Sequence, residues 1–429
     1  MKEFGGSNMN VCGIVAEYNP FHNGHFFHLQ ESIRQTDCEY TICVLSGNFT
    51  QRGESALFDK WVRTKMALDA GADIIIELPI LYVLQPAEWF AYGAVSILDA
   101  LGVVTHISFG SEMQDIELLH YIANTLLDEP IEYKLALKQS LQSGCSFPSA
   151  QSEALLYYTQ RYTVKLNDRL NDIRKIISTP NNILGIEYLK CLKRRNSPII
   201  PVLISRIGAS HHSKEIHEGI VSATAIRDFI YAHQLHPQLK ENLPAFIFKI
   251  IADEITDQNG PVFIEDFERI IVALLRQHQI ERISQLPDVA EGLEYRIKKA
   301  VEQKVKLKDI LSMIKTKRYT YTRLQRIALY TLLNIDRDII EWARQLDTPP
   351  YARILGFSHH SLPLLTQIKK TSRIPLITKM ADAPFILDSN GNKMMYYDTL
   401  ATDIYALAIK NPDKSKAKRD YTQKIILPF

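Results

Sequence analysis

The sequence predicts an α/β fold in which a doubly wound, mainly parallel sheet fills the first half of the chain. Two observations lead to this prediction. Short apolar runs alternate with helical patterns in units of about 30 residues, which is typical of parallel strand–helix–strand repeats. From about residue 236 to residue 345, by contrast, apolar residues recur only at helical spacing. A chain of 429 residues has room for about two to three domains.

Each strand is assigned from a short apolar run that ends at turn residues, because such runs indicate strands buried on both faces. The five predicted strands are residues 10–17, 40–45, 73–78, 103–109 and 199–204. Helices are predicted at residues 24–33, 60–70, 89–101 and 224–233, with a mostly helical stretch at 115–195. The segment DSNGN at residues 388–392 is expected to form a hairpin turn.

The same pass along the chain divides it into three domains. Residues 9–235 hold the predicted sheet, residues 236–348 form an α-helical domain, and residues 349–429 form a small mixed α+β part. The pair Pro349-Pro350 marks the linker before the last part. Residues 1–8 are a polar extension outside this division.

Composition and charge exclude several classes of protein. Fifty Lys and Arg against 48 Asp and Glu give a net charge of +2, which argues against a uniformly basic or a disordered acidic chain. The most apolar region, residues 72–109, is interrupted by four acidic residues, and its charge-free pieces are far shorter than the ~20 residues of a membrane-spanning helix. Five cysteines without a CxxC pair favour a reducing compartment. We therefore expect a cytoplasmic protein with no membrane partner.

The segment EYNPFHNGH at residues 17–25 lies where the first predicted strand ends and the first helix begins. A helix N-terminus attracts phosphate, and His22 and His25 lie on one helix face because they are three residues apart. Gly24 leaves room for a nucleotide, and two imidazoles there can stabilise charge on a leaving pyrophosphate. A lone HxxH pair is more often a pair of capping or surface histidines. Since no further ligand follows at zinc spacing, no metal site is predicted.

A second motif, VSATAIR, occupies residues 221–227. Ser222 and Thr224 lie at a predicted helix start, where hydroxyls cap N–H groups or meet phosphate, and Arg227 can reach a triphosphate one turn later. By itself this pattern is an ordinary N-cap. HxGH followed by a motif similar to ISxTxIR, however, resembles the nucleotidyltransferase superfamily related to the class I aminoacyl-tRNA synthetases. That resemblance implies a Rossmann-like domain that catalyses substitution at an α-phosphate.

Further segments narrow the resemblance. They are residues 46–54 (SGNFTQRGE), 108–112 (SFGSE), 179–188 (TPNNILGIEY), 206–209 (RIGA), 316–326 and 353–357. Together with residues 17–25 they closely resemble the bacterial tRNA(Met) cytidine acetate ligase family, over nearly the whole chain from Met9. The resemblance implies an enzyme that activates acetate with ATP, accompanied by Mg²⁺, to give acetyl-adenylate and pyrophosphate. It then implies acetyl transfer to the wobble cytidine of elongator tRNA(Met), giving N4-acetylcytidine.

The resemblance also implies site residues by position. His22 and His25 are the predicted catalytic residues. The predicted ATP-binding residues are Val15, Ala16, Glu17, Tyr18, Asn19, Pro20, Phe21, His22, Asn23, Gly24, His25, Phe26, Phe27, His28, Gly110, Asn181, Arg206, Ser222, Thr224 and Arg227. Asn182 stays open as the alternative to Asn181, and an Asn pair at this point also suits a helix N-cap. Without the resemblance, Gly110 is a turn glycine and Arg206 equally a surface ion pair.

A basic stretch covers residues 296–326, with eleven Lys or Arg and two acidic residues. Its net charge is +9, so the remaining residues together carry −7. Cations grip phosphates, and the interspersed Tyr319 and Tyr321 could stack on unpaired bases. The predicted tRNA contacts are Lys315, Lys317, Arg318, Arg323 and Arg326. A solvated helix face is the alternative.

Two other functions fit part of the pattern. A small-molecule adenylyl- or cytidylyltransferase of cofactor biosynthesis would share the HxGH motif, but the long C-terminal part and the basic stretch disfavour it. A non-catalytic RNA-binding protein would not need His22, Gly24, His25, Thr224 and Arg227, all of which are present.

Overall fold

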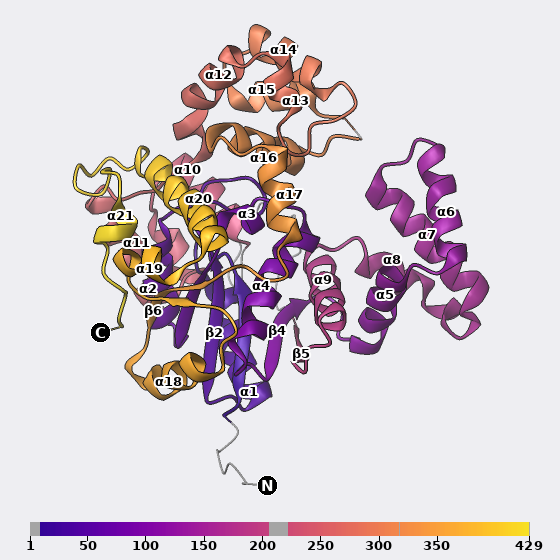
Figure 1. Ribbon diagram of the computed structural model, residues 1–429, viewed down its shortest axis with the longest axis horizontal. Helices are drawn as coiled ribbons and strands as arrows, with labels where there is room; N and C mark the ends of the chain where they lie inside the picture. The colour runs from indigo at the N-terminus through magenta and orange to yellow at the C-terminus, as the bar shows by residue number, and fades with distance from the viewer. Residues whose placement is uncertain (1–8, 206–221, 317, 429) are drawn as a thin grey trace.

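The computed structural model describes residues 9–205, 222–316 and 318–428 (Figure 1). At its centre is a seven-stranded sheet in the order β5-β4-β1-β2-β3-β6-β7. Five strands run mutually parallel and confirm the predicted doubly wound sheet: β1 (Val11–Ala16), β2 (Tyr40–Ser46), β3 (Ile74–Leu78), β4 (His106–Ser111) and β5 (Ile200–Ser205).

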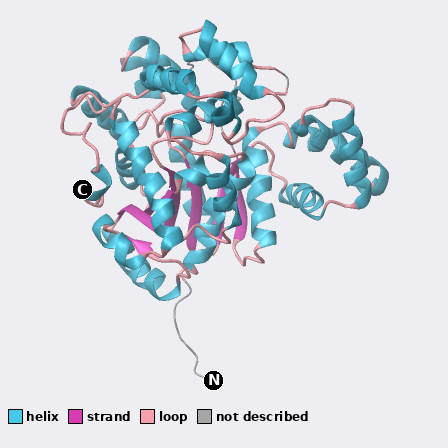
Figure 2. Ribbon diagram, turned by 45° about the horizontal axis from the view of Figure 1, so that its top comes forward, coloured by secondary structure: helices cyan, strands magenta, loops and turns pink. Residues whose placement is uncertain are grey.

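Helices cover both faces of this sheet, as Figure 2 shows. Among them are α1 (Asn23–Thr36), α2 (Lys60–Asp69), α3 (Ile80–Val83), α4 (Ala87–Leu101), α9 (Pro180–Arg194), α10 (Ala223–His233) and α11 (Ala245–Thr256). Successive side chains of a strand point to opposite faces, so Ile42 and Val44 join one apolar core while Cys43 and Leu45 join another. Burial on both faces explains why these strands read as continuous apolar runs.

Two groups of helices extend beyond the sheet (Figure 1). One projects to the side and comprises α5 (Ile116–Asp128), α6 (Ile131–Gln142), α7 (Phe147–Tyr162) and α8 (Leu170–Ile176). The other lies above the sheet and comprises α12 (Glu268–Gln277), α13 (Ile280–Ser284), α14 (Leu293–Gln303), α15 (Leu307–Ile314), α16 (Tyr321–Leu332) and α17 (Arg337–Gln345). Both stretches were predicted to be helical, and the described part of residues 236–348 contains no strand.

The C-terminal part adds its strands to the same sheet. β6 (Ala352–Phe357) pairs antiparallel with β3, and β7 (Leu376–Ile377) pairs with β6. The remaining helices are α18 (Leu362–Thr371), α19 (Ala383–Ile386), α20 (Ser389–Ala406) and α21 (Arg419–Thr422). The hairpin predicted at residues 388–392 is wrong: Asp388 caps α20, its carboxylate accepting from the Gly391 amide at 2.7 Å. Asp, Ser and Asn favour helix N-caps as strongly as turns.

No helix in the described ranges is both long and apolar enough to cross a bilayer.

Candidate active site

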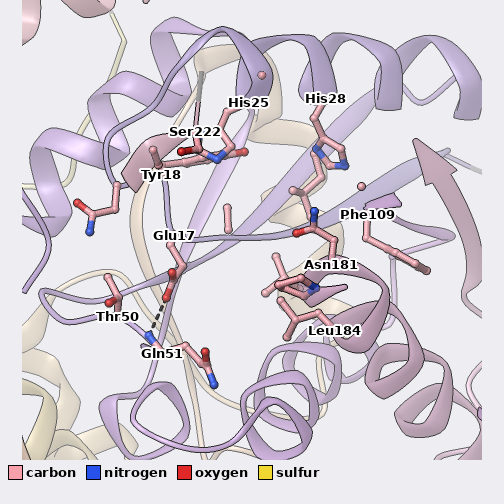
Figure 3. Close-up of a pocket in the computed structure, with 18 of the residues that line it drawn as sticks. Glu17, Tyr18, His25, His28, Thr50, Gln51, Phe109, Asn181, Leu184 and Ser222 are labelled. Carbon is pink, nitrogen blue, oxygen red and sulfur yellow. Dashed lines mark hydrogen bonds between the residues drawn. The ribbon is translucent and has the colours of Figure 1, made fainter. Parts of the chain in front are cut away.

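A cavity of about 430 Å³ lies at the carboxyl ends of β1, β4 and β5 (Figure 3). β1 is followed along the chain by its neighbour β2 on one side, whereas β4 is followed by its neighbour β5 on the other side. The strand order therefore reverses between β1 and β4, and parallel sheets bind ligands at such a switch point. Four helices start at the cavity, because first-turn residues of α1, α4, α9 and α10 all line it: Gly24, Ala87, Asn181 and Thr224. Helix N-termini offer free N–H groups and partial positive charge, so the cavity suits a polyanionic ligand.

The two predicted catalytic histidines form a stacked pair at the start of α1. Their ring centroids are 3.8 Å apart and the planes differ by 23°. His22 is buried and caps the helix, its Nδ1 accepting from the Gly24 amide at 3.0 Å. A neutral His22 ring that accepts at Nδ1 carries its proton on Nε2, where it can donate. Tyr18 packs edge-on to the His25 ring at 5.1 Å and limits its motion.

The second predicted motif, at the start of α10, lines the same cavity as the histidine motif and contacts the histidine loop. The Ser222 hydroxyl caps α10 by accepting from the Ala225 amide at 3.2 Å, and Ser222 and Thr224 both line the cavity. Arg227 also lines it, but its guanidinium donates to the Asn19 carbonyl at 2.8 Å and to Glu54 Oε2 at 2.7 Å. Arg227 therefore ties α10 to the histidine loop and to the loop after β2.

The structure distinguishes Asn181 from Asn182. Asn182 is buried, accepting from the Ser111 hydroxyl at 2.7 Å and donating to the Thr179 hydroxyl at 2.7 Å, so it holds α9 against β4. Asn181 faces the cavity and donates to Glu112 Oε1 at 2.8 Å. The expectation that the Asn pair caps α9 is wrong: Thr179 is the N-cap residue, and Pro180 fills the first helical position.

The other predicted nucleotide residues divide into two groups. Lining the cavity are Val15, Ala16, Glu17, Tyr18, Asn19, Phe27, His28 and Gly110. Pro20, Phe21, Asn23 and Phe26 do not line it. Phe21 is fully buried in an apolar core, the Asn23 amide donates to the Glu241 carbonyl, and Phe26 packs on Phe246. Arg206 and Lys317 lie outside the described residues.

Sequence reasoning missed an aromatic wall and did not assign the cavity residues of the loop after β2. Phe109 and Tyr188 meet edge-to-face at 5.5 Å, and α9 approaches closely because Gly185 has no side chain; a Cβ there would lie 2.5 Å from the Phe109 ring. From the loop after β2, cavity residues are Thr50, Gln51, Arg52 and Glu54. The family resemblance included residues 46–54 as a segment, but nothing in the sequence singled out these four residues.

Glu17 directly follows β1 and directs its carboxylate into the cavity (Figure 3). The Gln51 backbone amide donates to Oε1 at 2.7 Å. Burial raises the pKa of Glu17, and the Gln51 bond and the charges of Arg52 and Arg227 oppose that rise. The buried Arg63 donates to the carbonyls of Glu17 at 2.7 Å and Ser46 at 3.0 Å, which fixes the ends of β1 and β2 relative to each other.

Comparison with known proteins agrees with this geometry. A family model described as HIGH Nucleotidyl Transferase matches residues 9–420. A tRNA(Met) cytidine acetate ligase of Acetivibrio thermocellus is 43% identical over 98% of this chain and 100% of its own length. One of a Thermoanaerobacter species is 44% identical over 97% and 100%. The chain belongs to the tRNA(Met) cytidine acetate ligase family.

Solved members of the family confirm the predicted fold. Crystal structures of TmcAL from Thermotoga maritima, one bound with alpha-thio ATP and one apo, give TM-scores of 0.91 and 0.93. Each is 33% identical and covers 98% of this chain and 100% of that chain.

The predicted RNA contacts do not all lie on the surface. Arg326 is buried and paired with Asp288 at 3.2 Å, while Arg323 donates to the Asp288 carbonyl at 2.9 and 2.6 Å. Tyr319 is buried beneath Arg323, so it cannot stack on a base. Lys315 and Arg318 are exposed, with Arg318 paired to Glu291 at 2.7 Å. Arg323 and Arg326 thus hold the loop around Asp288.

Proposed function

We propose that this chain activates acetate with ATP and transfers the acetyl group to the wobble cytidine of elongator tRNA(Met) in the cytoplasm. The observation that carries the proposal is the stacked His22–His25 pair at a cavity where four helices begin. The alpha-thio ATP in the Thermotoga maritima relative and the names of the curated relatives support it.

The residues suit the first half-reaction. The acetate carboxylate attacks the α-phosphorus, and negative charge grows on the bridging oxygen and the pyrophosphate that leaves. His22 Nε2–H, His25 and the N–H groups that open α1 and α10 are positioned to stabilise that charge. The aromatic wall of Phe109 and Tyr188 offers a face for the adenine ring.

We expect ATP to bind as its Mg²⁺ complex. The described residues contain no group of three His, Cys, Asp or Glu side chains arranged to hold a metal. Mg²⁺ commonly binds through substrate phosphates and one or two carboxylates, so we expect it to arrive on the triphosphate. We assign it no step.

The direct test incubates the protein with ATP, labelled acetate and elongator tRNA(Met), followed by nucleoside analysis of the tRNA. Labelled N4-acetylcytidine is expected, and it should depend on ATP. Its absence would overturn the proposal. Pyrophosphate exchange that depends on a phosphorylated small molecule, and not on acetate, would favour a cofactor-forming nucleotidyltransferase.

The tRNA surface that we propose centres on α14 and α15, because six exposed cations of the basic stretch lie on or beside these two helices. They are Arg296, Lys299, Lys304, Lys306, Lys308 and Lys315. Tyr295 is 60% exposed beside them and can stack on a base. Since Gly53 packs against the backbone of Arg326, this helical group also contacts the loop that lines the cavity.

Charge reversal tests this surface. The Lys304→Glu/Lys308→Glu variant should bind elongator tRNA(Met) more weakly. The slope of its log binding constant against log salt concentration should also be shallower, by the amount expected for the loss of about two phosphate contacts. The matched control reverses the exposed Lys369 and Lys370 of α18. Fluorescence anisotropy across a salt series measures both. An equal loss in the two variants would show non-specific electrostatics and would argue against a surface on α14 and α15.

The two neighbouring asparagines should behave differently. Asn181→Ala removes a cavity-facing amide and should weaken ATP binding by about three- to tenfold, corresponding to one hydrogen bond. Asn182→Ala leaves buried partners unpaired and should lower the free energy of unfolding by about 1–3 kcal/mol. Calorimetric ATP titration and urea unfolding measure the two effects. Weaker ATP binding from Asn182→Ala without destabilisation would reverse the assignment.

A further inference from the structure

Glu17 is a carboxylate inside a cavity otherwise suited to anions, and the charge stabilisation described above does not use it. We propose that Glu17 is the general base of the second half-reaction, accepting the proton that the exocyclic amine of cytidine loses when it takes the acetyl group. This inference rests on the proposed function and assigns a residue to its transfer step.

The geometry of Glu17 suits a proton acceptor. The Gln51 amide fixes Oε1 at 2.7 Å, while no donor in the described part of the chain reaches Oε2. The side chain projects from the end of β1 into the cavity beside Gln51 and Thr50 (Figure 3). Arg63 holds the Glu17 carbonyl at 2.7 Å, so the backbone that carries the carboxylate is also fixed. One oxygen is thus oriented and the other remains available to a ligand.

The surroundings of Glu17 make its carboxylate more basic than an exposed one. Burial raises the pKa of Glu17, and the Glu54 charge adds to that rise. The Gln51 bond and the charges of Arg52 and Arg227 act in the opposite direction and lower the pKa. A carboxylate with a raised pKa is a stronger base, so it accepts a proton more readily in the transition state.

Two other acid–base groups of the cavity, Glu54 and His22, already have partners. Among the described lining residues, the second carboxylate is Glu54, which is paired with Arg227 at 2.7 Å. His22 Nδ1 already accepts from the Gly24 amide, and the His22–His25 pair lies at the helix N-terminus that suits phosphate. A carboxylate is itself a poor partner for a triphosphate, because like charges repel. Glu17 therefore suits the uncharged amine better than the nucleotide.

The step balances as follows. The amine nitrogen forms a bond to the acetyl carbon of the acetyl-adenylate, and the bond from that carbon to the phosphate oxygen breaks, releasing AMP. One N–H proton passes to Glu17 Oε2 and later to solvent. An aromatic amine is weakly nucleophilic because its lone pair is delocalised, so removing this proton during the attack lowers the barrier.

The test measures acetyl-adenylate formation and tRNA acetylation separately in the Glu17→Gln variant. This substitution keeps the shape of the side chain and removes the proton acceptor. Hydroxylamine is a strong nucleophile that traps acetyl-adenylate as acetohydroxamate without tRNA. Acetylation of elongator tRNA(Met) should fall by about 100-fold or more, whereas hydroxamate formation should fall far less. The control is Glu117→Gln, an exposed carboxylate on α5 remote from the cavity, which should change neither rate.

Each other outcome has a distinct meaning. A parallel loss of hydroxamate and of tRNA acetylation would place Glu17 in nucleotide binding and overturn the inference. Retention of both activities would also overturn it. If the unsubstituted protein makes neither product, the proposed function itself fails, and this result is distinguishable from failure of the Glu17 assignment.

Discussion

His25→Ala should lower acetate-dependent pyrophosphate exchange by about 10²–10³-fold, because it removes a group positioned to stabilise charge on the leaving pyrophosphate. The His25 ring stacks on His22 at 3.8 Å and is held by Tyr18, so its position is fixed before a ligand arrives. Fixed donors act without reorganisation during the reaction. The loss should appear in the rate at saturating ATP, since the interaction strengthens as charge develops.

Two controls make this result interpretable. His120→Ala removes an exposed imidazole from α5 and should leave the exchange rate unchanged. Elongator tRNA(Met) should still bind His25→Ala, which would separate a catalytic defect from a folding defect. A loss smaller than tenfold would show that helix N–H groups, not the stacked imidazoles, stabilise the leaving group.

The sheet and the histidine loop were predictable because their signals are local. A continuous apolar run ending in EYNPFHNGH contains both the strand and the phosphate-binding turn, and β1 and α1 follow that order. Asn181 and Asn182 were not separable in this way. Neighbouring helix positions point about 100° apart, and which one faces the cavity depends on how α9 packs on β4.

Charge in a sequence likewise does not reveal exposure. Arg323 and Arg326 lie in the most basic stretch of the chain, but they turn inward to Asp288, 35 and 38 residues away. Burial of an arginine depends on such a distant partner, and no local pattern encodes it. The exposed cations of α14 and α15 were in the same stretch, so the net charge located the region but not its residues.

The C-terminal strands show a third feature that could not be predicted from the sequence, the pairing of strands far apart in the chain. Pairing of β6 with β3 joins residues almost 280 positions apart, as the Glu77–Arg353 bond shows. Glu77 and Arg353 belong to a buried ion cluster, in which Lys60 also contacts Glu77 at 2.7 Å and Asp420 at 2.8 Å. Arg353 contacts the same two carboxylates at 2.9 and 2.7 Å. Two cations from α2 and β6 thus neutralise two anions from β3 and α21.

Lys60→Met should lower the free energy of unfolding by about 3–5 kcal/mol, because the buried carboxylates of Glu77 and Asp420 would then share the single cation Arg353 and one negative charge would be uncompensated. Burial alone would raise the pKa of Asp420, but the charges of Arg353 and Lys60 lower this pKa to about 2. The Asp420 carboxylate is therefore charged at neutral pH. Its stabilising contribution is present above the unfolded pKa and disappears as the pH falls through about 2. Urea unfolding at pH 7 measures the loss.

Lys65→Met is the matched control, since Lys65 lies on the same helix and pairs with Asp69 at 2.5 Å near the surface. A surface pair contributes about 0.3–0.5 kcal/mol, so the two substitutions should differ several-fold. In Lys60→Met/Glu77→Gln, one cation and one anion are removed together, and Arg353 can still pair with Asp420. This double variant should be more stable than Lys60→Met. If it is not, the buried cluster acts through packing and not through charge balance, and the C-terminal strands would dock on β3 for reasons of shape.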